Sequence, residues 1–251
     1  MKLLIQKNFE ELSKKAAAMI AEEIRRKPDI VLGLATGGTP LGTYKELIRM
    51  HKEEGLDFSK VVTFNLDEYY NLSPENDQSY YYYMHENFFN HINMKPQNIH
   101  IPDGKARDIE AACREYDKMI SEYGGIDLQL LGIGQNGHIG FNEPGDELLV
   151  DTHLTELKKN TILVNSRYFA SADDVPKKAV TMGLGTIMQA EKILLIANGN
   201  KKAKIMNELL GDNTVSTKVP ASFLLLHKDL TIIIDEEAAQ LYNKKQNSRI
   251  I

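Results

Sequence analysis

The hydrophobic positions of this chain follow two different spacings along its length. Phe9–Arg26 carries apolar residues three and four positions apart, which predicts an amphipathic helix, and Asn8 in front of it suits an N-cap. The helical spacing returns in five later segments, Thr39–Lys52, Ser79–Asn90, Ile109–Tyr123, Lys177–Ala190 and Lys201–Leu210. Short apolar runs predict strands at Ile30–Ala35, Val61–Asn65, Ile126–Ile133, Lys192–Ala197 and Leu230–Ile234, with one more candidate at Thr161–Asn165. Strands that are apolar on both faces need cover on both, so the pattern predicts an α/β fold with a parallel sheet flanked by helices.

Composition limits what the chain can be. Its 251 residues suffice for a single α/β domain over 1–251, and 42% of them are hydrophobic. The net charge of −5 argues against nucleic-acid binding, which needs clustered Lys and Arg. No apolar run approaches the roughly 18 residues of a membrane helix, and the N-terminal stretch is too short for a signal peptide. The single cysteine, Cys113, falls in a predicted helix, so we interpret it as a buried packing residue and expect a soluble, cytoplasmic protein.

The segment from Leu131 to Gly145 carries the densest candidate chemistry. A predicted strand ends there in glycines, and Asn136, His138 and Glu143 follow. Glycine lets the backbone approach a ligand closely, and histidine exchanges protons near neutral pH. Open α/β sheets place their active sites at the carboxyl ends of strands. The pattern therefore favours an acid–base site, and the alternative is a tight turn with a solvent-facing histidine.

A second motif, Thr36-Gly37-Gly38-Thr39-Pro40, joins the first core strand to a helix. Gly37 and Gly38 free backbone N–H groups to face a ligand, and Pro40 suits the first helical turn. A helix N-terminus of this kind is suited to bind phosphate. The glycine spacing matches neither a P-loop nor a dinucleotide fingerprint. The motif predicts a phosphate cradle, and the alternative is a glycine turn with Thr39 as the helix cap.

Two adjacent carboxylates, Asp67 and Glu68, follow the predicted strand Val61–Asn65. Neighbouring residues of an extended chain point in opposite directions, so one carboxylate can face the expected crevice while the other faces away. The local sequence does not decide which one faces inward. Two solvated acids in a loop are the alternative.

Basic side chains at two further strand ends could complete an anion site. Lys201 and Lys202 open a helix after the strand Lys192–Ala197, and a lysine at a helix start opposes the helix dipole unless an anion binds there. Arg167 follows the strand candidate Thr161–Asn165. Each cation taken alone fits a solvated surface charge. The seven histidines are scattered, so we expect no metal site, and no G-x-S-x-G nucleophile motif occurs.

At these positions the chain resembles the glucosamine-6-phosphate deaminase family over nearly its whole length. The resemblance rests on the motif 36–40 and on four other segments, Phe64-Asn65-Leu66-Asp67-Glu68-Tyr69, Gly137-His138-Ile139-Gly140-Phe141-Asn142-Glu143-Pro144, Asn165-Ser166-Arg167 and Gly199-Asn200-Lys201-Lys202-Ala203. It implies a modified Rossmann-type parallel sheet with an active-site lid at about 144–175. It also implies a reaction without a cofactor, in which the phosphosugar D-glucosamine 6-phosphate and water give D-fructose 6-phosphate and ammonia.

The resemblance assigns a role to each candidate side chain. His138 would open the pyranose ring, with Asn136 and Glu143 orienting it and setting its charge. Asp67 would move the C2 proton to C1 through an enolamine. The phosphate would be bound by Gly37, Gly38, Thr39, Arg167 and Lys202.

Two departures from the family pattern bear on pH dependence and regulation. Many members carry Asp where this chain has Asn136, and an amide can accept a hydrogen bond from imidazole without stabilising its charged form. Some members are hexamers activated by N-acetylglucosamine 6-phosphate through basic residues, whereas the aligned stretch here, Asp151–Glu156, has no Arg or Lys. The chain also ends before the C-terminal extension of those forms. We therefore expect no such activation, and a monomer or a small homo-oligomer.

Two rival functions stay open at this point. A 6-phosphogluconolactonase shares the fold, the Gly-His motif and a phosphosugar substrate but needs no C2 base. Its histidine is followed by Thr-Ala-Ser-Leu-Phe, whereas Ile139-Gly140-Phe141-Asn142-Glu143 follows here. A non-catalytic phosphosugar sensor would carry a DNA-binding helix-turn-helix, and the first helix near Phe9 and the first core strand near Ile30 leave no room for one.

Overall fold

Seven strands form one parallel sheet through the middle of the molecule. The structure is a computed structural model, and it describes residues 1–166, 169, 171, 174–211 and 213–247. The strand order is β1-β10-β9-β6-β2-β3-β5, and every neighbouring pair is parallel, as the sequence predicts. The strands are β1 (Lys2–Gln6), β2 (Val31–Leu34), β3 (Val62–Asn65), β5 (Ile99–His100), β6 (Leu128–Leu131), β9 (Lys192–Ala197) and β10 (Leu230–Asp235).

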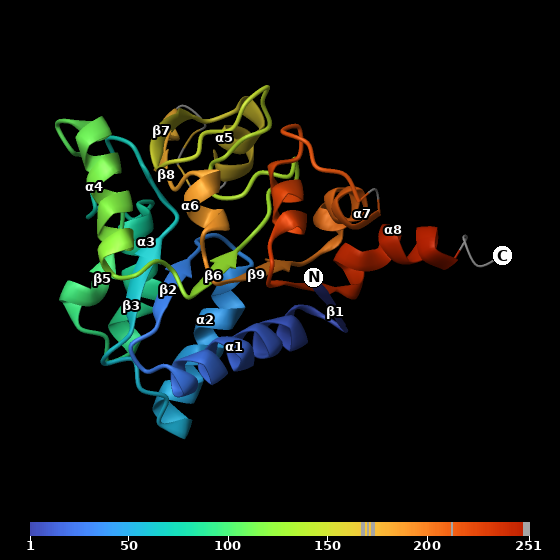
Figure 1. The fold of residues 1–251 in the computed structure, drawn as a ribbon, viewed down its shortest axis with the longest axis horizontal. Helices are drawn as coiled ribbons and strands as arrows, with labels where there is room; N and C mark the ends of the chain where they lie inside the picture. Colours follow the sequence, from blue (N-terminus) through green and yellow to red (C-terminus); the bar gives the residue numbers. More distant parts are fainter. Residues whose placement is uncertain (167–168, 170, 172–173, 212, 248–251) are drawn as a thin grey trace.

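Helices cover both faces of this sheet (Figure 1). One layer consists of α1 (Phe9–Arg26), α2 (Pro40–Glu54) and α3 (Tyr80–Asn87), and the other of α4 (Ile109–Glu122), α6 (Leu184–Met188), α7 (Ala203–Gly211) and α8 (Glu236–Asn247). Successive side chains of β9 join different layers: Leu194 and Ile196 belong to the apolar cluster of the first, Ile193 and Leu195 to that of the second. This alternation explains why the strands are apolar at consecutive positions.

Several predicted elements lie where the sequence places them. α1 has the predicted bounds, and the Asn8 side chain caps it by accepting the Glu11 N–H at 3.0 Å. β9 also has the predicted bounds. Cys113 is buried in α4, in agreement with its interpretation as a packing residue. No helix within the described ranges is both long and apolar enough to cross a membrane.

Two predicted elements are wrong. The strand candidate Thr161–Asn165 is part of a helix, α5 (Lys159–Asn165). The segment Lys177–Ala190, predicted as one helix, contains strand β8 (Lys178–Thr181) followed by the short helix α6. Strand formation at β8 depends on partners that are distant in sequence, so the local spacing of apolar residues does not reveal it.

Strand β8 belongs to a second, antiparallel sheet with the order β4-β8-β7. β4 (Asp67–Tyr69) follows β3 almost directly, and β7 (His153–Glu156) lies next to α5 within the predicted lid segment. Tyr69, Phe141 and Leu157 belong to the small apolar cluster of this region. Figure 1 shows β7, β8 and α5 together at the top of the view. The lid segment therefore has secondary structure of its own.

The winding of the chain reverses in the middle of the large sheet. From β2 the chain proceeds outward to β3 and β5, and it then returns to β6 on the other side of β2 and proceeds to β9 and β10. In open α/β sheets, ligands bind at the carboxyl ends of the strands at such a reversal. The loops that follow β2 and β6 are the two glycine-rich motifs of the sequence, so the topology brings them to one place.

Candidate active site

A pocket lies at this reversal, beside the carboxyl ends of the strands. Its walls come from the segments that follow β2, β3, β6 and β9, together with parts of α3 and α5. Six residues predicted from the sequence line it, namely Gly37, Gly38, Thr39, Asp67, His138 and Lys202. The separate motifs of the sequence thus form one site.

The loop after β2 presents bare backbone to the pocket. Gly37 has a φ of +97°, a left-handed conformation that favours glycine. Its carbonyl oxygen accepts a hydrogen bond from the Tyr83 hydroxyl at 2.7 Å, which ties the loop to α3. A Cβ atom added at Gly38 would meet no other atom within 4 Å. The loop therefore leaves room for an anion next to the N-terminus of α2.

Thr39 does not cap α2 with its side chain. Its backbone angles are helical, and its hydroxyl donates to the Asn198 side-chain oxygen at 2.6 Å. Thr39 thus occupies the N-cap position of α2, but its side chain makes no capping hydrogen bond. The hydrogen bond joins the loop after β2 to the loop after β9, so two segments predicted to bind an anion lie side by side.

Lys202 lies in a 3-10 turn, Asn200–Lys202, that leads from β9 into α7. Its ammonium group donates to the Ile133 carbonyl oxygen, and the side chain lines the pocket. Lys201, its neighbour, is exposed. The structure thus assigns only one of the two lysines to the site. Arg167, the other predicted cation, lies outside the described residues.

The adjacent carboxylates lie on opposite sides of β4. Asp67 lines the pocket at 6% exposure, and burial, together with the charge of Glu68, raises its pKa to about 8. Glu68 is also buried, and it accepts backbone N–H groups from Tyr69, Tyr80 and Tyr81 at 2.8–2.9 Å. The predicted alternation is confirmed, with Asp67 inward, and the alternative of two solvated acids is wrong.

Two glycines make the histidine loop compact. A Cβ atom at Gly134 would lie 2.3–2.5 Å from atoms of the His138 ring, so the imidazole packs directly against this backbone. Gly140 has a φ of +56°, and a Cβ atom there would come to 3.5 Å from Asp67 Oδ2. The loop that carries His138 therefore lies beside Asp67.

Glu143 is the centre of a polar cluster next to His138. Its Oε2 atom lies 3.5 Å from His138 Nδ1, an ion-pair distance longer than a direct hydrogen bond. Oε2 also accepts from the Asn136 amide at 2.8 Å, and Oε1 accepts from the Thr161 hydroxyl. Burial raises the pKa of Glu143, but the contacts with His138, Thr161 and Asn136 outweigh it and hold the pKa below its ordinary value. Glu143 is thus a carboxylate that can stabilise an imidazolium.

Asn136 acts on the histidine through the backbone. Its amide oxygen accepts the backbone N–H of His138 at 3.2 Å, whereas its amide nitrogen donates to Glu143. The imidazole itself faces Glu143. An aspartate at position 136 would place a second negative charge next to Glu143, so Asn136 avoids a repulsion between two carboxylates.

Known proteins share both the sequence and the fold. A family model described as glucosamine-6-phosphate isomerases/6-phosphogluconolactonase matches residues 5–233. This chain belongs to that family. Members named glucosamine-6-phosphate deaminase include one from Halothermothrix orenii, 57% identical over 96% of this chain and 100% of the relative. Another, from Clostridium perfringens, is 56% identical over 96% of this chain and 99% of the relative.

Two solved structures resemble this chain, one closely and one distantly. A monomeric glucosamine-6-phosphate deaminase superposes with a TM-score of 0.94 at 51% identity, over 96% of this chain and 100% of that one. A 6-phosphogluconolactonase from Trypanosoma brucei superposes with a TM-score of 0.74 at 21% identity, over 95% and 97%, which shows a shared fold alone. The family resemblance and the Rossmann-type sheet predicted from the motifs are confirmed.

The family motifs did not reveal two further residues that line the pocket, Tyr80 and Thr161. The Tyr80 ring stacks on Phe141 with 6.0 Å between ring centroids and an interplanar angle of 8°. The run of four tyrosines that begins at Tyr80 was a visible signal for an unusual helix start. Thr161 had no local signal, because its place beside Glu143 depends on how α5 folds over the pocket.

Proposed function

We propose that this chain catalyses the isomerising deamination of D-glucosamine 6-phosphate, in which the sugar phosphate and water give D-fructose 6-phosphate and ammonia. The observation that carries the proposal is the placement of Asp67 and His138 in one pocket with a glycine loop and a lysine. Relatives more than half identical over nearly the whole chain are named for this activity. The reaction moves only protons, water and ammonia, so it needs no redox cofactor.

Asp67 is the proposed base that removes the C2 proton and returns it at C1. General bases work best when their pKa lies near the operating pH, and that of Asp67 is raised to about 8 by burial and by Glu68. The substrate carries its amino group on the same carbon. A protonated amine there lowers the pKa of a neighbouring carboxyl group, so substrate binding would favour the ionised base.

His138 is the proposed group that opens the sugar ring, by taking the O1 proton and delivering a proton to O5. This role requires an imidazole that alternates between its neutral and its charged form. The carboxylate of Glu143 lies 3.5 Å from Nδ1 of this ring. Asn136 holds Glu143 and the loop in place through its two hydrogen bonds. After ring opening and proton transfer, water adds at C2 and ammonia leaves.

The phosphate is proposed to bind between the loop 37–39 and Lys202. The glycines leave open space beside the N-terminus of α2, and Lys202 supplies a positive charge on the same pocket. Phosphate recognition by a lysine and by backbone N–H groups supports a sugar phosphate rather than a neutral sugar. A contribution from Arg167 stays a prediction, as does motion of the lid segment 144–175.

We further infer that the protein is a monomer without activation by N-acetylglucosamine 6-phosphate. The relative of known structure at 51% identity is described as monomeric. In this chain Asp151–Glu156 carries no Arg or Lys and includes β7. Light scattering should give a mass near 28.4 kDa. A sigmoidal rate curve that the acetylated sugar makes hyperbolic would contradict the inference. A cytoplasmic location stays our expectation from the single cysteine.

Ammonia release from D-glucosamine 6-phosphate by the purified protein in metal-free buffer tests the proposal. We expect hyperbolic turnover, with fructose 6-phosphate and ammonia formed in equal amounts. Asp67→Asn is the matched control. It keeps the shape of the side chain and leaves the proposed phosphate site intact, but it removes the base. A folded wild-type protein that binds the sugar phosphate and releases no ammonia would contradict the proposal.

The lactonase reaction is tested in the same preparation. Hydrolysis of 6-phosphogluconolactone needs a proton acceptor at the position of His138. It removes no proton from C2, so it needs no base in the role of Asp67. We therefore expect hydrolysis of the lactone to be slow compared with deamination. Lactone hydrolysis that exceeds ammonia release, and that survives Asp67→Asn, would favour the lactonase activity.

A further inference from the structure

Glu68 is a buried carboxylate that the proposed chemistry does not use. It is 4% exposed, and its Oε1 accepts the N–H groups of Tyr69 and Tyr80 at 2.8 and 2.9 Å, while Oε2 accepts that of Tyr81 at 2.8 Å. Each of these partners is a backbone donor and favours the ionised carboxylate, while burial outweighs these hydrogen bonds and raises the pKa of Glu68 above its ordinary value. The positive end of a helix thus serves where a cationic side chain would be expected.

These hydrogen bonds fasten the start of α3 to β4. The first N–H groups of a helix have no partner within the helix. In α3, those of Tyr80 and Tyr81 go to Glu68, and that of Tyr82 goes to the Ser79 hydroxyl at 3.0 Å. Helices usually take such caps from the residues just before them. Glu68 supplies two of them from a strand, and this joins two elements of the site.

Helix α3 in turn contacts both sides of the pocket. Tyr80, its first residue, lines the pocket and stacks on Phe141, which lies in the loop of His138. One turn later, the Tyr83 hydroxyl donates to the Gly37 carbonyl oxygen at 2.7 Å. A single helical turn therefore connects Glu68, the neighbour of Asp67, to the glycine loop.

We propose that Glu68 is a positioning residue of the active site. By fastening α3 to β4, it fixes the spacing between Asp67 and the glycine loop, and hence between the base and the C2 atom of a substrate held by its phosphate. The inference rests on the proposed function of the chain. A misplacement of about 1 Å can reduce turnover by about 10²-fold, so this link matters although Glu68 touches no reacting atom.

Glu68 also acts on Asp67 through its charge. Among the described residues, the titratable groups near Asp67 are its neighbour Glu68 on β4, Tyr44 on α2, Tyr80 on α3, Tyr116 on α4 and, in the same pocket, His138 and Lys202. Burial raises the pKa values of the three tyrosines, so they are neutral at physiological pH. Among these groups, Glu68 is the one whose charge adds to the raised pKa of Asp67. Loss of its charge should therefore lower the pKa of Asp67.

Glu68→Gln tests the inference. The substitution keeps the shape of the side chain, removes its charge, and replaces one acceptor oxygen by an NH2 group that cannot accept an N–H. We expect kcat/KM to fall about 10²-fold, its acidic limb to move to lower pH, and amide hydrogen exchange at Tyr80 and Tyr81 to become faster. Ser79→Ala is the matched control, because it removes the third cap of α3 and leaves Glu68 in place. It should lower Tm without moving the acidic limb.

A purely structural role for Glu68 gives a different result. The Tm of Glu68→Gln would then fall while kcat/KM and its acidic limb kept their wild-type values in the folded enzyme, and the inference would be overturned. If Glu68→Gln does not fold, Tyr83→Phe tests the link from its other end. It should raise KM several-fold with the acidic limb unmoved, and an unchanged KM would overturn the inference.

Failure of the proposed function can be told apart from failure of this inference. If the wild-type protein releases no ammonia, inorganic phosphate serves as the probe of the glycine loop. Weaker phosphate binding by Glu68→Gln together with faster exchange at Tyr80 and Tyr81 would still support the link. Equal binding and equal exchange in the two proteins would contradict it.

Discussion

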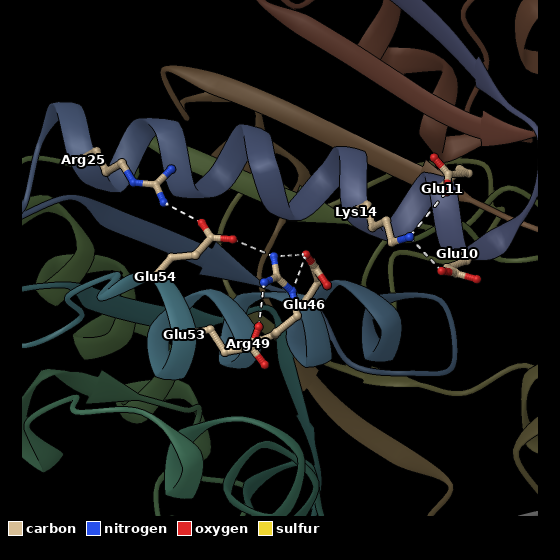
Figure 2. A network of polar contacts seen from close by, with 8 residues as sticks. All are labelled: Glu10, Glu11, Lys14, Arg25, Glu46, Arg49, Glu53 and Glu54. Carbon is tan, nitrogen blue, oxygen red and sulfur yellow. Dashed lines mark hydrogen bonds and ion pairs between the residues drawn. The ribbon is translucent and has the colours of Figure 1, made fainter.

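Acidic side chains on the outer surface of α1 and α2 form a network with arginines. Figure 2 shows Glu54 of α2 between Arg25 of α1, at 3.2 Å, and Arg49 of α2, at 2.7 Å. Arg49 also pairs with Glu46 and Glu53. Hydrogen bonds and charge from Arg49 and Arg25 hold the pKa of Glu54 below its ordinary value. Glu54 is thus stabilised as an anion by two cations on the surface.

The carboxylate of Asp67 in the pocket is in the opposite situation. Asp67 is almost fully buried, and among the residues that the structure describes no cation shifts its pKa, which burial and Glu68 raise to about 8. Burial of such a group costs stability, and active sites are where proteins tolerate the cost. The surface network favours the folded state slightly, whereas Asp67 disfavours it at high pH. The direction of the pKa shift thus separates the paired surface carboxylate of Glu54 from Asp67, the carboxylate proposed as the base.

Asp67→Asn should produce the largest effect on activity. Removal of a general base typically costs about 10²–10⁴-fold, and the amide cannot take up the C2 proton, so we expect ammonia release to fall at least about 10³-fold. Substrate binding should change little, because the substitution leaves the proposed phosphate site intact. Ammonia release and the affinity for inorganic phosphate are measured together. Near-wild-type turnover would exclude Asp67 as the base.

The same substitution should stabilise the protein. Folded Asp67 keeps its proton up to about pH 8, whereas the unfolded chain releases it near its ordinary value of 3.8. The stability that the protonated group contributes is therefore lost as pH rises from about 4 to about 8. At pH 8.5, Asp67→Asn should raise the free energy of unfolding by at least about 1 kcal/mol, or Tm by roughly 2–4 °C. A lower Tm of the variant at that pH would contradict the inference that the buried charge of Asp67 destabilises the folded protein.

The wild-type enzyme should lose activity in acid. Because the base must be ionised, kcat/KM should fall about tenfold per pH unit below the pKa of free Asp67, near 8. The acidic limb of kcat reports the pKa of Asp67 in the enzyme–substrate complex. The substrate amine lowers that pKa, so the limb of kcat should lie at lower pH than the limb of kcat/KM. Measurement of both profiles between pH 5.5 and 9.5 checks the order. Coincident limbs would mean that the amine does not approach Asp67.

Gly134→Ala should displace the imidazole. The new methyl group would lie 2.3–2.5 Å from the ring of His138, so the ring must leave its present position beside Glu143. We expect kcat to fall about 10²-fold with little change in Tm. Gly124→Ala is the control, because its φ of +87° strains the backbone at a turn where a Cβ meets nothing within 4 Å. It should lower Tm and keep the wild-type kcat.

The sequence predicts the parts of the fold and site that depend on local pattern. The inner strands follow from short apolar runs and α1 from the helical spacing of its apolar residues, and a parallel sheet then brings the loops after β2, β3, β6 and β9 to one edge. Edge strands β1 and β5 were missed because they are only partly buried and carry a weaker pattern. The sequence wrongly predicts a helix at β8, because the partners of this strand are distant in sequence.

The residues of the site also divide into those that a local motif predicts and those that depend on distant contacts. His138 and the glycine loop were evident from their motifs, whereas the inward direction of Asp67 came from the family resemblance and not from the local sequence. The hydrogen bonds of Asn136 could not be foreseen, because they depend on the path of the loop between Gly134 and Glu143. Contacts between segments far apart in sequence, such as that of Thr39 with Asn198, carry no local signal.

Thr161→Val tests a contact of this kind. Its hydroxyl donates to Glu143 Oε1 from α5, within the predicted lid, and valine keeps the shape without the donor. The pKa of Glu143 should rise and its hold on His138 should loosen, so we expect kcat to fall about tenfold. Thr161→Ser retains the hydroxyl and should keep most of the activity. Equal loss in both variants would point to packing of α5 rather than to the hydrogen bond.

Arg49→Gln should have the smallest effect and tests the other side of the comparison. Arg49 contacts three glutamates, yet exposed ion pairs contribute little and are screened by salt, so Tm should fall by less than about 3 °C. In 1 M salt, where the screening length is about 3 Å, the difference from wild type should vanish. The Tm gain of Asp67→Asn should persist in that salt, because the buried group is shielded from ions. A large loss of Tm in Arg49→Gln that persists in salt would contradict the proposed difference between exposed and buried charges.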